Sequence, residues 1–362
     1  MVRRREDEVL NIIKADPLIS QKEIADKLGI TRSSVGVHVN NLTKKGRIIG
    51  RGYVISREDR ICIIGGSNID VWAKSGTDLI NGEASEGDIK ISVGGVGRNI
   101  AENICKLGMQ PEFITAISND EYGKHIQSHS LKEGVRIDKS LVFRNQKTSF
   151  FVGLLNEDNK LEYGVSDTSI IKEIKPSLIN QKKEEINNCN LIVLDLSLPE
   201  ETIEFVMSNF KNRKIWIDPV SVSKLYKIKD KFRNIQFLIL NWKELSELSG
   251  SQVESVQEAR NAASILIEEG VEEIVVINGD YSMSYISADD QIDLEISGEE
   301  MINKKGVREA QLAALVYAFH NEMDIEECLR FALVAGEITG QSQDVVSPWL
   351  NVEKIFEGFD NE

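Results

Sequence analysis

Hydrophobic and polar positions follow two different patterns along the 362-residue chain. In the first part, apolar side chains recur at helical spacing, as they do over residues 35–42. Further along, short continuous apolar runs such as ICII at residues 61–64 alternate with helical patterns. Runs of that kind are typical of strands that are buried on both faces. We therefore expect a small helical domain over residues 1–57 and an α/β domain over residues 58–362.

The helical part of the chain carries sequence signals for three short helices. The first covers residues 5–15, and Ser20 opens the second with the capping-box pattern Ser-Gln-Lys-Glu. Gly29 then makes a tight turn, and Thr31 caps the third helix. Residues 48–55 alternate between apolar and polar side chains. This order of elements predicts three helices followed by a short β-hairpin.

Charge divides the chain at the same place as the hydrophobic pattern. Residues 1–57 hold 12 Lys and Arg against 6 Asp and Glu, a net charge of +6. The remaining residues hold 31 against 52, a net charge of −21. A basic segment on an acidic body predicts that only the N-terminal part binds a polyanion.

Composition narrows the class of protein. Hydrophobic residues make up 41% and charged residues 28% of the chain, which excludes disorder as the main state. No stretch of about 18 apolar residues occurs, and the charged start MVRRREDEVL leads into no apolar signal segment. We therefore expect a globular protein that stays in the cytoplasm.

The N-terminal pattern resembles the winged helix-turn-helix domain of bacterial transcription regulators. The three helices, the glycine turn and the basic hairpin carry this resemblance. It implies that the third helix enters the major groove of DNA and that the hairpin, as the wing, contacts phosphates. The residues expected to contact duplex DNA are Arg32, Ser33, Ser34, His38, Lys44, Lys45 and Arg51. The alternative is a small helical domain that is used for protein contacts.

The acidic body alternates strand and helix patterns, which predicts a mainly parallel sheet covered by helices. Apolar runs expected to be strands lie at residues 60–64, 113–117, 191–194, 215–217, 237–240 and 274–277. Helical patterns separate them, for example at residues 97–107, 201–209, 256–269 and 309–319. A hairpin is expected to form a small β lid at about residues 140–166.

Two glycine-rich turns in this body point to ligand binding. Gly65-Gly66-Ser67-Asn68-Ile69-Asp70 follows the first strand, and Gly94-Gly95-Val96-Gly97-Arg98-Asn99 opens a helix. Glycine lets a backbone approach a ligand closely, and a helix N-terminus presents free N–H groups. Together the turns resemble the PfkB/ribokinase family, which implies a ribokinase-like fold over roughly residues 60–350. Within that family the pattern is most similar to the pseudouridine kinases, as are Asp218-Pro219-Val220-Ser221 and Ser166-Asp167.

The resemblance implies a site that binds a nucleoside or a sugar. The residues expected to bind the base and the hydroxyls are Asn68, Asp70, Gly94, Gly95, Asn99 and Asp167. Asn241 and Glu244 match the family's NxxE motif, which organises Mg²⁺ and phosphate. An amide and a carboxylate supplemented by water suit an octahedral Mg²⁺ ion. For each of these residues, the alternative is an ordinary turn, cap or solvated polar position.

A second family signature is altered in this chain. In the family it reads Asn or Asp and then TxGAGD, in which the GAG backbone holds the transferring phosphoryl group and the Asp is the base. Here residues 303–309 read Asn-Lys-Lys-Gly-Val-Arg-Glu. Glu309 is one methylene longer than the base it replaces, and a displacement of about 1 Å can cost on the order of 100-fold in rate. Arg308 replaces the second glycine and should block the approach of phosphate to the backbone.

The nucleotide side shows further changes. Lys304 and Lys305 stand before the first glycine, where the family has threonine and a variable residue, and the turn after the late strand keeps Gly279 but lacks the second glycine of the family's Gly-x-x-Gly. Basic side chains could still supply positive charge to phosphoryl oxygens. The residues expected to contact phosphate or nucleotide are Gly279, Lys304, Lys305, Gly306 and Arg308.

These features support two functions. In the first, the chain is a DNA-binding regulator whose kinase-like body senses a nucleoside or nucleoside phosphate, with phosphoryl transfer weakened or lost. In the second, it is an active pseudouridine or sugar kinase that uses ATP and Mg²⁺ to phosphorylate a primary hydroxyl. The expected partners are duplex DNA through residues 1–57, the nucleoside or sugar and, by analogy with two-fold operators, a second copy of the chain.

Overall fold

The computed structural model describes residues 2–48, 60–77, 82–156 and 161–359. Contacts divide the chain into two compact units, residues 1–60 with 183–190 and residues 61–182 with 191–362.

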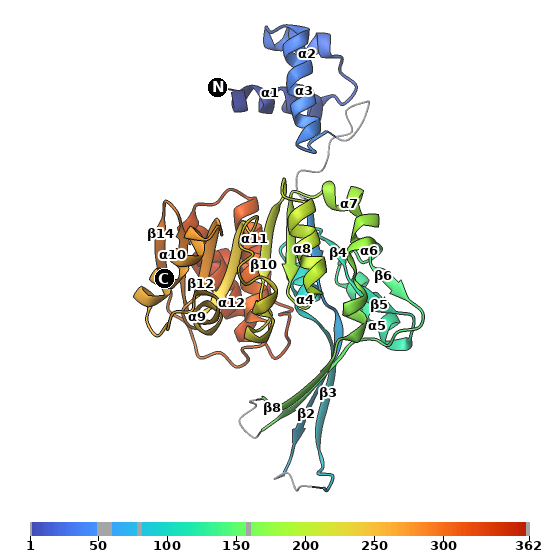
Figure 1. Cartoon of the computed structure of the whole chain (residues 1–362), viewed down its shortest axis with the longest axis vertical. Helices are drawn as coiled ribbons and strands as arrows, with labels where there is room; N and C mark the ends of the chain where they lie inside the picture. The colour runs from blue at the N-terminus through green and yellow to red at the C-terminus, as the bar shows by residue number, and fades with distance from the viewer. Residues whose placement is uncertain (1, 49–59, 78–81, 157–160, 360–362) are drawn as a thin grey trace. The chain divides into compact units, whose positions relative to one another are not determined.

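Three helices form the N-terminal unit, as the sequence predicts (Figure 1). They are α1 (Val2–Ala15), α2 (Gln21–Leu28) and α3 (Arg32–Lys44). Ser20 makes the predicted capping box, and Gly29 ends α2 in the left-handed conformation with a φ of 63°. The helices bury a small core of Val9, Leu10, Ile13, Ile19, Ile24, Ala25, Val35, Leu42 and Ile48. The predicted hairpin at residues 48–55 lies outside the described residues except for Ile48.

A short helix from the middle of the chain is grouped with this unit by the contacts. It is α7 (Lys183–Asn187).

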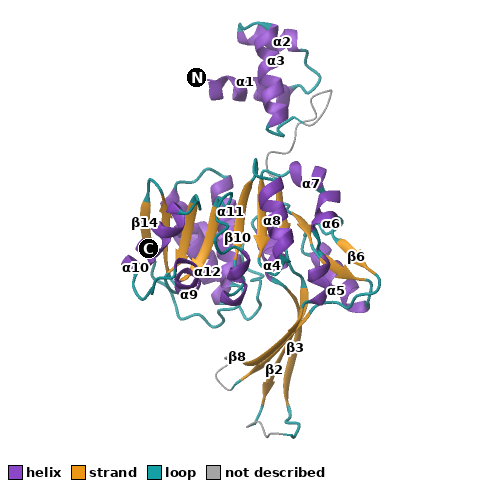
Figure 2. Cartoon of the chain, viewed as in Figure 1, coloured by secondary structure: helices purple, strands orange, loops and turns teal. Residues whose placement is uncertain are grey.

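An eight-stranded sheet forms the centre of the second unit (Figure 2). Its strands are β1 (Ile61–Ile64), β4 (Glu112–Ile114), β9 (Leu191–Asp195), β10 (Lys214–Asp218), β11 (Phe237–Asn241), β12 (Glu273–Ile277), β13 (Ser282–Ser287) and β14 (Gln291–Glu295). The strand order is β14-β13-β12-β11-β10-β9-β1-β4. Neighbours from β4 to β12 are parallel, whereas β13 and β14 add an antiparallel edge. The mainly parallel sheet is confirmed, and the antiparallel edge is an addition to the prediction.

Helices lie on both faces of this sheet, as Figure 2 shows. They are α4 (Val96–Lys106), α6 (Pro176–Gln181), α8 (Glu200–Asn209), α9 (Trp242–Ser249), α10 (Val256–Glu268), α11 (Val307–His320), α12 (Ile325–Gly340) and α13 (Val352–Phe359). Two short 3₁₀ helices cover Ser169–Glu173 and Val222–Lys227. Helix α11 packs against α4 and α12, so the N-termini of α4 and α11 belong to one layer. Among the described residues, no helix is long and apolar enough to cross a membrane.

The lid is larger than the predicted hairpin. It is a four-stranded sheet in the order β3-β2-β7-β8, made of β2 (Asn68–Ser75), β3 (Gly87–Gly94), β7 (Phe150–Leu155) and β8 (Leu161–Asp167). The predicted segment supplies β7 and β8, while half of the lid comes from residues 68–94. The lid strands extend away from the large sheet in Figure 1. The prediction missed β2 and β3 because neither has a long continuous apolar run: β3 alternates apolar and polar side chains, and the run in β2 is only Val71-Trp72-Ala73.

The strand predicted at residues 113–117 is two strands. It divides at Thr115 into β4 and β5 (Ala116–Ser118), which belong to different sheets. The carbonyl of Thr115 accepts a hydrogen bond from the backbone of Leu141, which begins β6 (Leu141–Phe143). This contact starts the pairing of β5 with β6, so the chain leaves the large sheet after β4. Helix α5 (Glu121–Lys132) packs against β5 and the lid strands β2 and β3.

Candidate functional site

The predicted sugar-side residues meet where the lid joins the large sheet. Asn68 and Asp70 lie on β2, and the register pairs Asn68 with Gly94 at the end of β3. The side-chain amide of Asn68 donates a hydrogen bond to the Asp70 carboxylate. Burial raises the pKa of Asp70 to about 6, opposed by that hydrogen bond and by the charges of Lys305 and Arg98. The structure thus sets a buried carboxylate near two cations.

The two glycines before α4 are required by this packing. A Cβ atom on Gly94 would lie 2.2 Å from Oδ2 of Asp70. Gly95 has a φ of 102°, and its Cβ would lie 2.6 Å from the Cα atom of Ser67. Glycine is therefore needed to bring the Asp70 carboxylate up to the turn, whether or not a ligand is bound. Contact of this backbone with a sugar stays a prediction.

Asp195 organises both glycine-rich turns, and the sequence reasoning missed it. This residue ends β9 and is fully buried. Its Oδ2 atom accepts hydrogen bonds from the backbone N–H groups of Gly66 at 2.7 Å and Gly97 at 2.9 Å. The available signal was an aspartate that directly follows the apolar run of residues 191–194, at the carboxyl edge of a parallel sheet where ligands bind.

Asn99 and Glu309 come together at the adjoining N-termini of α4 and α11. Glu309 lies in the first turn of α11, and its side chain shares a hydrogen bond with Asn99. Burial and the negative charge of Asp218 raise the pKa of Glu309 to about 7, although Arg308 and Asn99 oppose the rise. The replacement carboxylate therefore lies beside the predicted sugar-binding asparagine.

Arg308 is held by two carboxylates, one at the end of β10 and one in the first turn of α9. Its Nη1 atom donates to both carboxylate oxygens of Glu244, at 2.8 and 3.0 Å. Its Nε atom lies 3.2 Å from Oδ2 of Asp218, which ends β10. Burial lowers the pKa of Arg308, but the two carboxylates outweigh it and hold that pKa above its usual range. The guanidinium is thus the positive partner of a buried ion cluster.

The residues predicted to organise Mg²⁺ do not fit that ion in this arrangement. Asn241 caps α9, because its Oδ1 atom accepts from the backbone of Glu244 at 3.0 Å, and Oε2 of Glu244 accepts from the backbone of Asn241 at 3.0 Å. The same Glu244 oxygens bind Arg308. A dication beside Glu244 would lie next to the guanidinium and be repelled by it. Among the described residues, no group of three or more His, Cys, Asp or Glu side chains could hold a metal ion.

The predicted phosphate-binding cations each have a partner of their own. Lys304 forms an ion pair with Asp280. The ammonium of Lys305 lies 3.2 Å from the centre of the Trp72 ring. Arg308 is engaged as described above. The structure therefore does not gather the three cations at one anion position, and their contact with phosphate stays a prediction.

Gly306 and Gly279, the predicted phosphate-side glycines, differ in their surroundings. Gly306 precedes α11 with a φ of 79°, and a Cβ atom there would lie 1.8 Å from the carbonyl oxygen of Val345. A Cβ on Gly279 would have open space within 4 Å. The turn at Gly306 therefore requires glycine for its own packing, whereas the one at Gly279 does not.

Asp167, the predicted lid-side contact, ends β8 and is exposed. Its Oδ1 atom accepts from the backbone N–H and the hydroxyl of Ser169, which lowers the pKa of Asp167. The structure gives it a turn-forming role, and its contact with a ligand stays a prediction.

A cavity of about 1160 Å³ adjoins the sugar side. Trp72 and Lys90 of the lid, Arg98 of α4, Lys305 and residues 343–346 contribute to its wall. Arg98 is almost fully buried, donates to the Val93 carbonyl at 3.1 Å and contacts Nδ1 of His129 at 2.9 Å. Burial lowers the pKa of Arg98 to about 10, and the charges of Glu133 and Asp70 limit the fall. Arg98 therefore lines the cavity and lies close enough to Asp70 for the two charges to interact.

The outer face of α3 differs from the prediction. Arg32 and Ser33 are exposed and line a shallow hollow, together with Gly36, Val37 and Asn40. Asn40 was expected at the outer face or rim of this helix, whereas Gly36 and Val37 were missed, although their spacing places them on one helical face with Arg32 and Ser33.

Ser34 and His38 are only partly exposed. The Ser34 hydroxyl hydrogen-bonds that of Thr31 at 2.8 Å in the cap of α3. The Nδ1 atom of His38 is buried and has no hydrogen-bond partner among the described residues. Contact of either residue with DNA stays a prediction.

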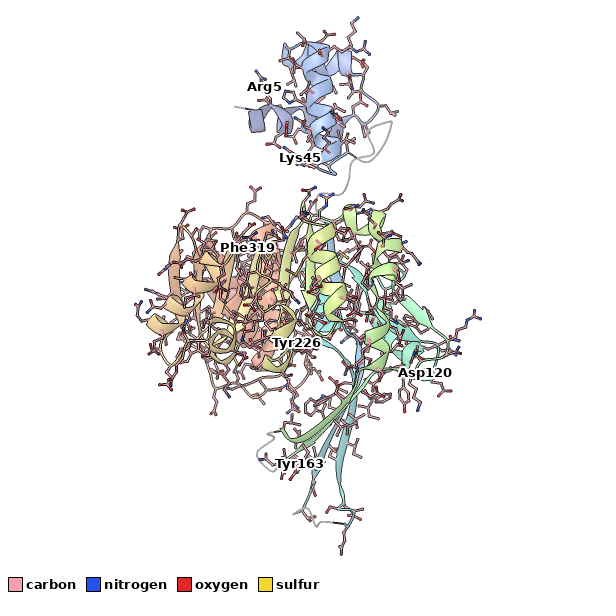
Figure 3. The ribbon with its side chains drawn as sticks, in the orientation of Figure 1. Arg5, Lys45, Asp120, Tyr163, Tyr226 and Phe319 are labelled. Atoms are coloured by element: carbon pink, nitrogen blue, oxygen red, sulfur yellow. The ribbon has the colours of Figure 1, made fainter. Side chains whose placement is uncertain are left out.

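The predicted phosphate contacts lie near the end of α3. Lys44 is exposed, and Lys45 forms a 2.5 Å ion pair with Glu6, which lowers the pKa of Glu6 (Figure 3). Arg51 lies outside the described residues.

Two family models match this chain. Residues 58–351 match the pfkB family of carbohydrate kinases, and residues 7–49 match the winged helix-turn-helix DNA-binding family.

Similar proteins include two from Escherichia coli K12. The chain is 29% identical over 354 residues to the uncharacterised sugar kinase YeiI, a match that covers 97% of this chain and 98% of the relative. It is 28% identical to a pseudouridine kinase, over 84% of this chain and 97% of the relative. A ribokinase structure from Thermotoga maritima shares the fold with a TM-score of 0.74 at 21% identity, over 83% of this chain and 99% of that one.

Proposed function

The chain belongs to the pfkB family of carbohydrate kinases and carries a winged helix-turn-helix DNA-binding domain, and on this premise we propose that it is a DNA-binding regulator. In this proposal the kinase domain senses a nucleoside or nucleoside phosphate, and phosphoryl transfer is weakened or lost. The family generally uses ATP and Mg²⁺. A regulator that binds DNA acts in the compartment that holds it, so we retain the expectation of a cytoplasmic protein.

The observation that carries the proposal is the pairing of Arg308 with Glu244 and Asp218. The guanidinium already neutralises the carboxylates that the NxxE motif and β10 bring to this position. Freeing Glu244 for a metal would break a buried ion pair, which costs roughly 3–5 kcal/mol. The arginine also replaces a glycine of the family signature, so its side chain occupies space that the family leaves open for phosphate.

The sugar side supports ligand binding without turnover. Asn68 and Asp70 on β2 and Asn99 on α4 supply two amides and a carboxylate, which suit recognition of hydroxyl groups. The similarity to a pseudouridine kinase favours a pyrimidine nucleoside as the ligand. Pseudouridine is our first candidate, and uridine is the second.

The test combines calorimetry with a coupled assay of ADP release. Pseudouridine, uridine, ribose and fructose phosphate are titrated first, and ATP turnover is then measured with each. We expect nucleoside binding that Asp70→Ala abolishes and that the exposed control Asp289→Ala retains, with little or no turnover. Robust turnover by the wild-type chain would overturn the sensing role.

A second function, an active ATP-dependent nucleoside kinase, is favoured by one observation. Glu309 lies beside Asn99 with a pKa of about 7, which is close to the optimum for a general base at neutral pH. The same assay separates the two functions, because turnover that Glu309→Gln removes would establish the kinase.

The DNA-binding role rests on the basic N-terminal unit and the exposed face of α3. We propose that Arg32, Ser33, Val37 and Asn40 face the base edges, since an exposed valine suits the methyl group of thymine and asparagine suits adenine. Affinity should fall steeply with salt, because lysine and arginine release counterions from phosphates. Electrophoretic mobility shifts with fragments of neighbouring genomic DNA test this; binding that is independent of salt would contradict it.

The lid offers a surface for the proposed homodimer. The register places Ile91, Val152 and Val165 in one row on the same face, with Val71 between Ile91 and Val152, and Ile89 and Tyr163 lie in the next row (Figure 3 labels Tyr163). Apart from the partly buried Val71, these side chains are exposed. Sedimentation velocity should therefore show a dimer for the wild-type chain and a monomer for Val165→Asp.

A further inference from the structure

Trp72 has the position of a ligand contact. It follows Asp70 by two residues on β2, so both side chains lie on the same face of the lid sheet. The register places Lys90 of β3 and Gly153 of β7 beside it on that face. Trp72 also lines the cavity that adjoins Asp70.

The lid is built to hold the Trp72 ring in a fixed position. A Cβ atom on Gly153 would lie 2.6 Å from the ring, so only glycine leaves room for the ring to lie across β7. Phe151 contacts the ring with a centroid distance of 5.0 Å and an interplanar angle of 55°. The indole Nε1 atom is buried and has no hydrogen-bond partner. These contacts fix the ring from the lid side, as expected for a preorganised binding surface.

A cation from the opposite wall covers the ring. The ammonium of Lys305 lies 3.2 Å from the ring centre, and Lys305 lines the same cavity. Burial lowers the pKa of this lysine, opposed by the charge of Asp70. A cation over an indole face is attracted by the ring quadrupole, and it occupies the position that a stacked planar group would take.

We propose that Trp72 is the stacking platform for the base of a nucleoside and that Lys305 covers this platform until the base displaces it. The inference rests on the proposed function, because it names the ligand class of the same site. A nucleoside presents a sugar to Asp70 and Asn99 and a planar base to the neighbouring cavity. A free sugar has no group that can displace the ammonium, so it leaves the ring covered. The Trp72–Lys305 pair therefore determines specificity for nucleosides over sugars.

The experiment measures binding of uridine, pseudouridine and ribose by calorimetry and by tryptophan fluorescence. Wild-type emission should change with either nucleoside and stay constant with ribose. Trp72→Leu should weaken nucleoside binding by about tenfold or more, because it removes one base–aromatic stack, and leave ribose binding within twofold. Trp72→Phe keeps an aromatic face and should restore most of the nucleoside affinity. Lys305→Met should strengthen nucleoside binding by about threefold, since no cation has to leave the ring.

Trp349→Phe is the matched control. Trp349 is an exposed tryptophan that also has a lysine, Lys354, near its ring, at 5.7 Å. The nucleoside-dependent emission change should survive in this variant and disappear in Trp72→Phe.

Each other outcome has a defined meaning. Equal nucleoside affinity in Trp72→Leu and the wild type would overturn the platform, and weaker binding by Lys305→Met would overturn the displacement of the lysine. A wild-type chain that binds ribose as tightly as nucleosides would overturn the platform alone. A chain that binds none of these ligands would overturn the proposed function together with it.

Discussion

The N-termini of α4 and α11 are built alike but are used differently. Each helix follows a glycine with a positive φ, 102° at Gly95 and 79° at Gly306. At α4 the charged group that stabilises the turn comes from another element, because Asp195 at the end of β9 accepts hydrogen bonds from both glycine-rich turns. At α11 the charge comes from the helix itself, through Arg308.

This difference decides what each helix start can do. Because Asp195 fixes the first turn from β9, the buried side chain of Asn99 on α4 is left to hydrogen-bond Glu309. Arg308 instead forms ion pairs with Glu244 and Asp218, so the carboxylates on the phosphate side are already neutralised. A glycine turn before a helix therefore indicates only that a backbone must bend. Whether an anion or a metal can bind at such a turn depends on the charged side chain nearest to it and on the group with which that side chain is already paired.

The largest expected effect is at Asp195. Asp195→Ala removes a buried carboxylate and leaves the N–H groups of Gly66, Gly97 and Ser197 without an acceptor. We expect the free energy of unfolding to fall by roughly 3–5 kcal/mol, because each unsatisfied buried donor costs about 1–3 kcal/mol. Urea denaturation measures this loss. The exposed control Asp289→Ala should stay within about 0.5 kcal/mol of the wild type; a similar loss in both variants would contradict the structural role of Asp195.

The second prediction concerns the first turn of α11, where substitutions at Val307, Arg308 and Glu309 restore the family signature. Arg308→Gly opens the turn but leaves the carboxylate of Glu309 misplaced, and Glu309→Asp corrects the base but leaves the arginine. Groups that act as a unit are not additive, so the triple change with Val307→Ala should gain more turnover than the product of the single gains. We expect a gain on the order of 100-fold in ADP release. Additive gains would show that these positions do not form one unit.

The comparison also shows what could be predicted from the sequence. The parallel sheet and the three N-terminal helices follow from local patterns, because periodicity and turn chemistry are local properties. The site residues around Asp70 are instead implied by the resemblance to the kinase family. The pairing of Arg308 with Glu244 joins residues 64 positions apart and depends on the register of β10, β11 and α11. No spacing rule in the sequence contains that information. Asp195 could have been found as an acidic residue at the carboxyl end of a buried strand.

Glu309 should make stability depend on pH. Its pKa is about 7 in the folded chain, against 4.5 for an ordinary glutamate. Between these values the folded state keeps a proton that the unfolded chain has lost, so stability falls as pH rises from about 4.5 to 7. Glu309→Gln should remove roughly 2–3 kcal/mol of that fall, measured by urea denaturation at a series of pH values. Asp70 titrates in the same direction with a pKa of about 6, so some pH dependence should remain in the variant.

The smallest effect concerns Lys304 and tests whether the cations of the phosphate side act together. Lys304 is exposed and pairs with Asp280, so Lys304→Ala should change stability by less than about 1 kcal/mol. Because the structure gives Lys304, Lys305 and Arg308 separate partners, the affinity for a nucleoside monophosphate should also stay within about twofold of the wild type, measured by calorimetry. Lys229→Ala, at another exposed lysine, provides the control. A marked loss of monophosphate affinity in Lys304→Ala alone would mean that the cations converge on one phosphate when the ligand binds. The N-terminus of α11 would then be able to bind an anion, despite the ion pairs that Arg308 forms with Glu244 and Asp218.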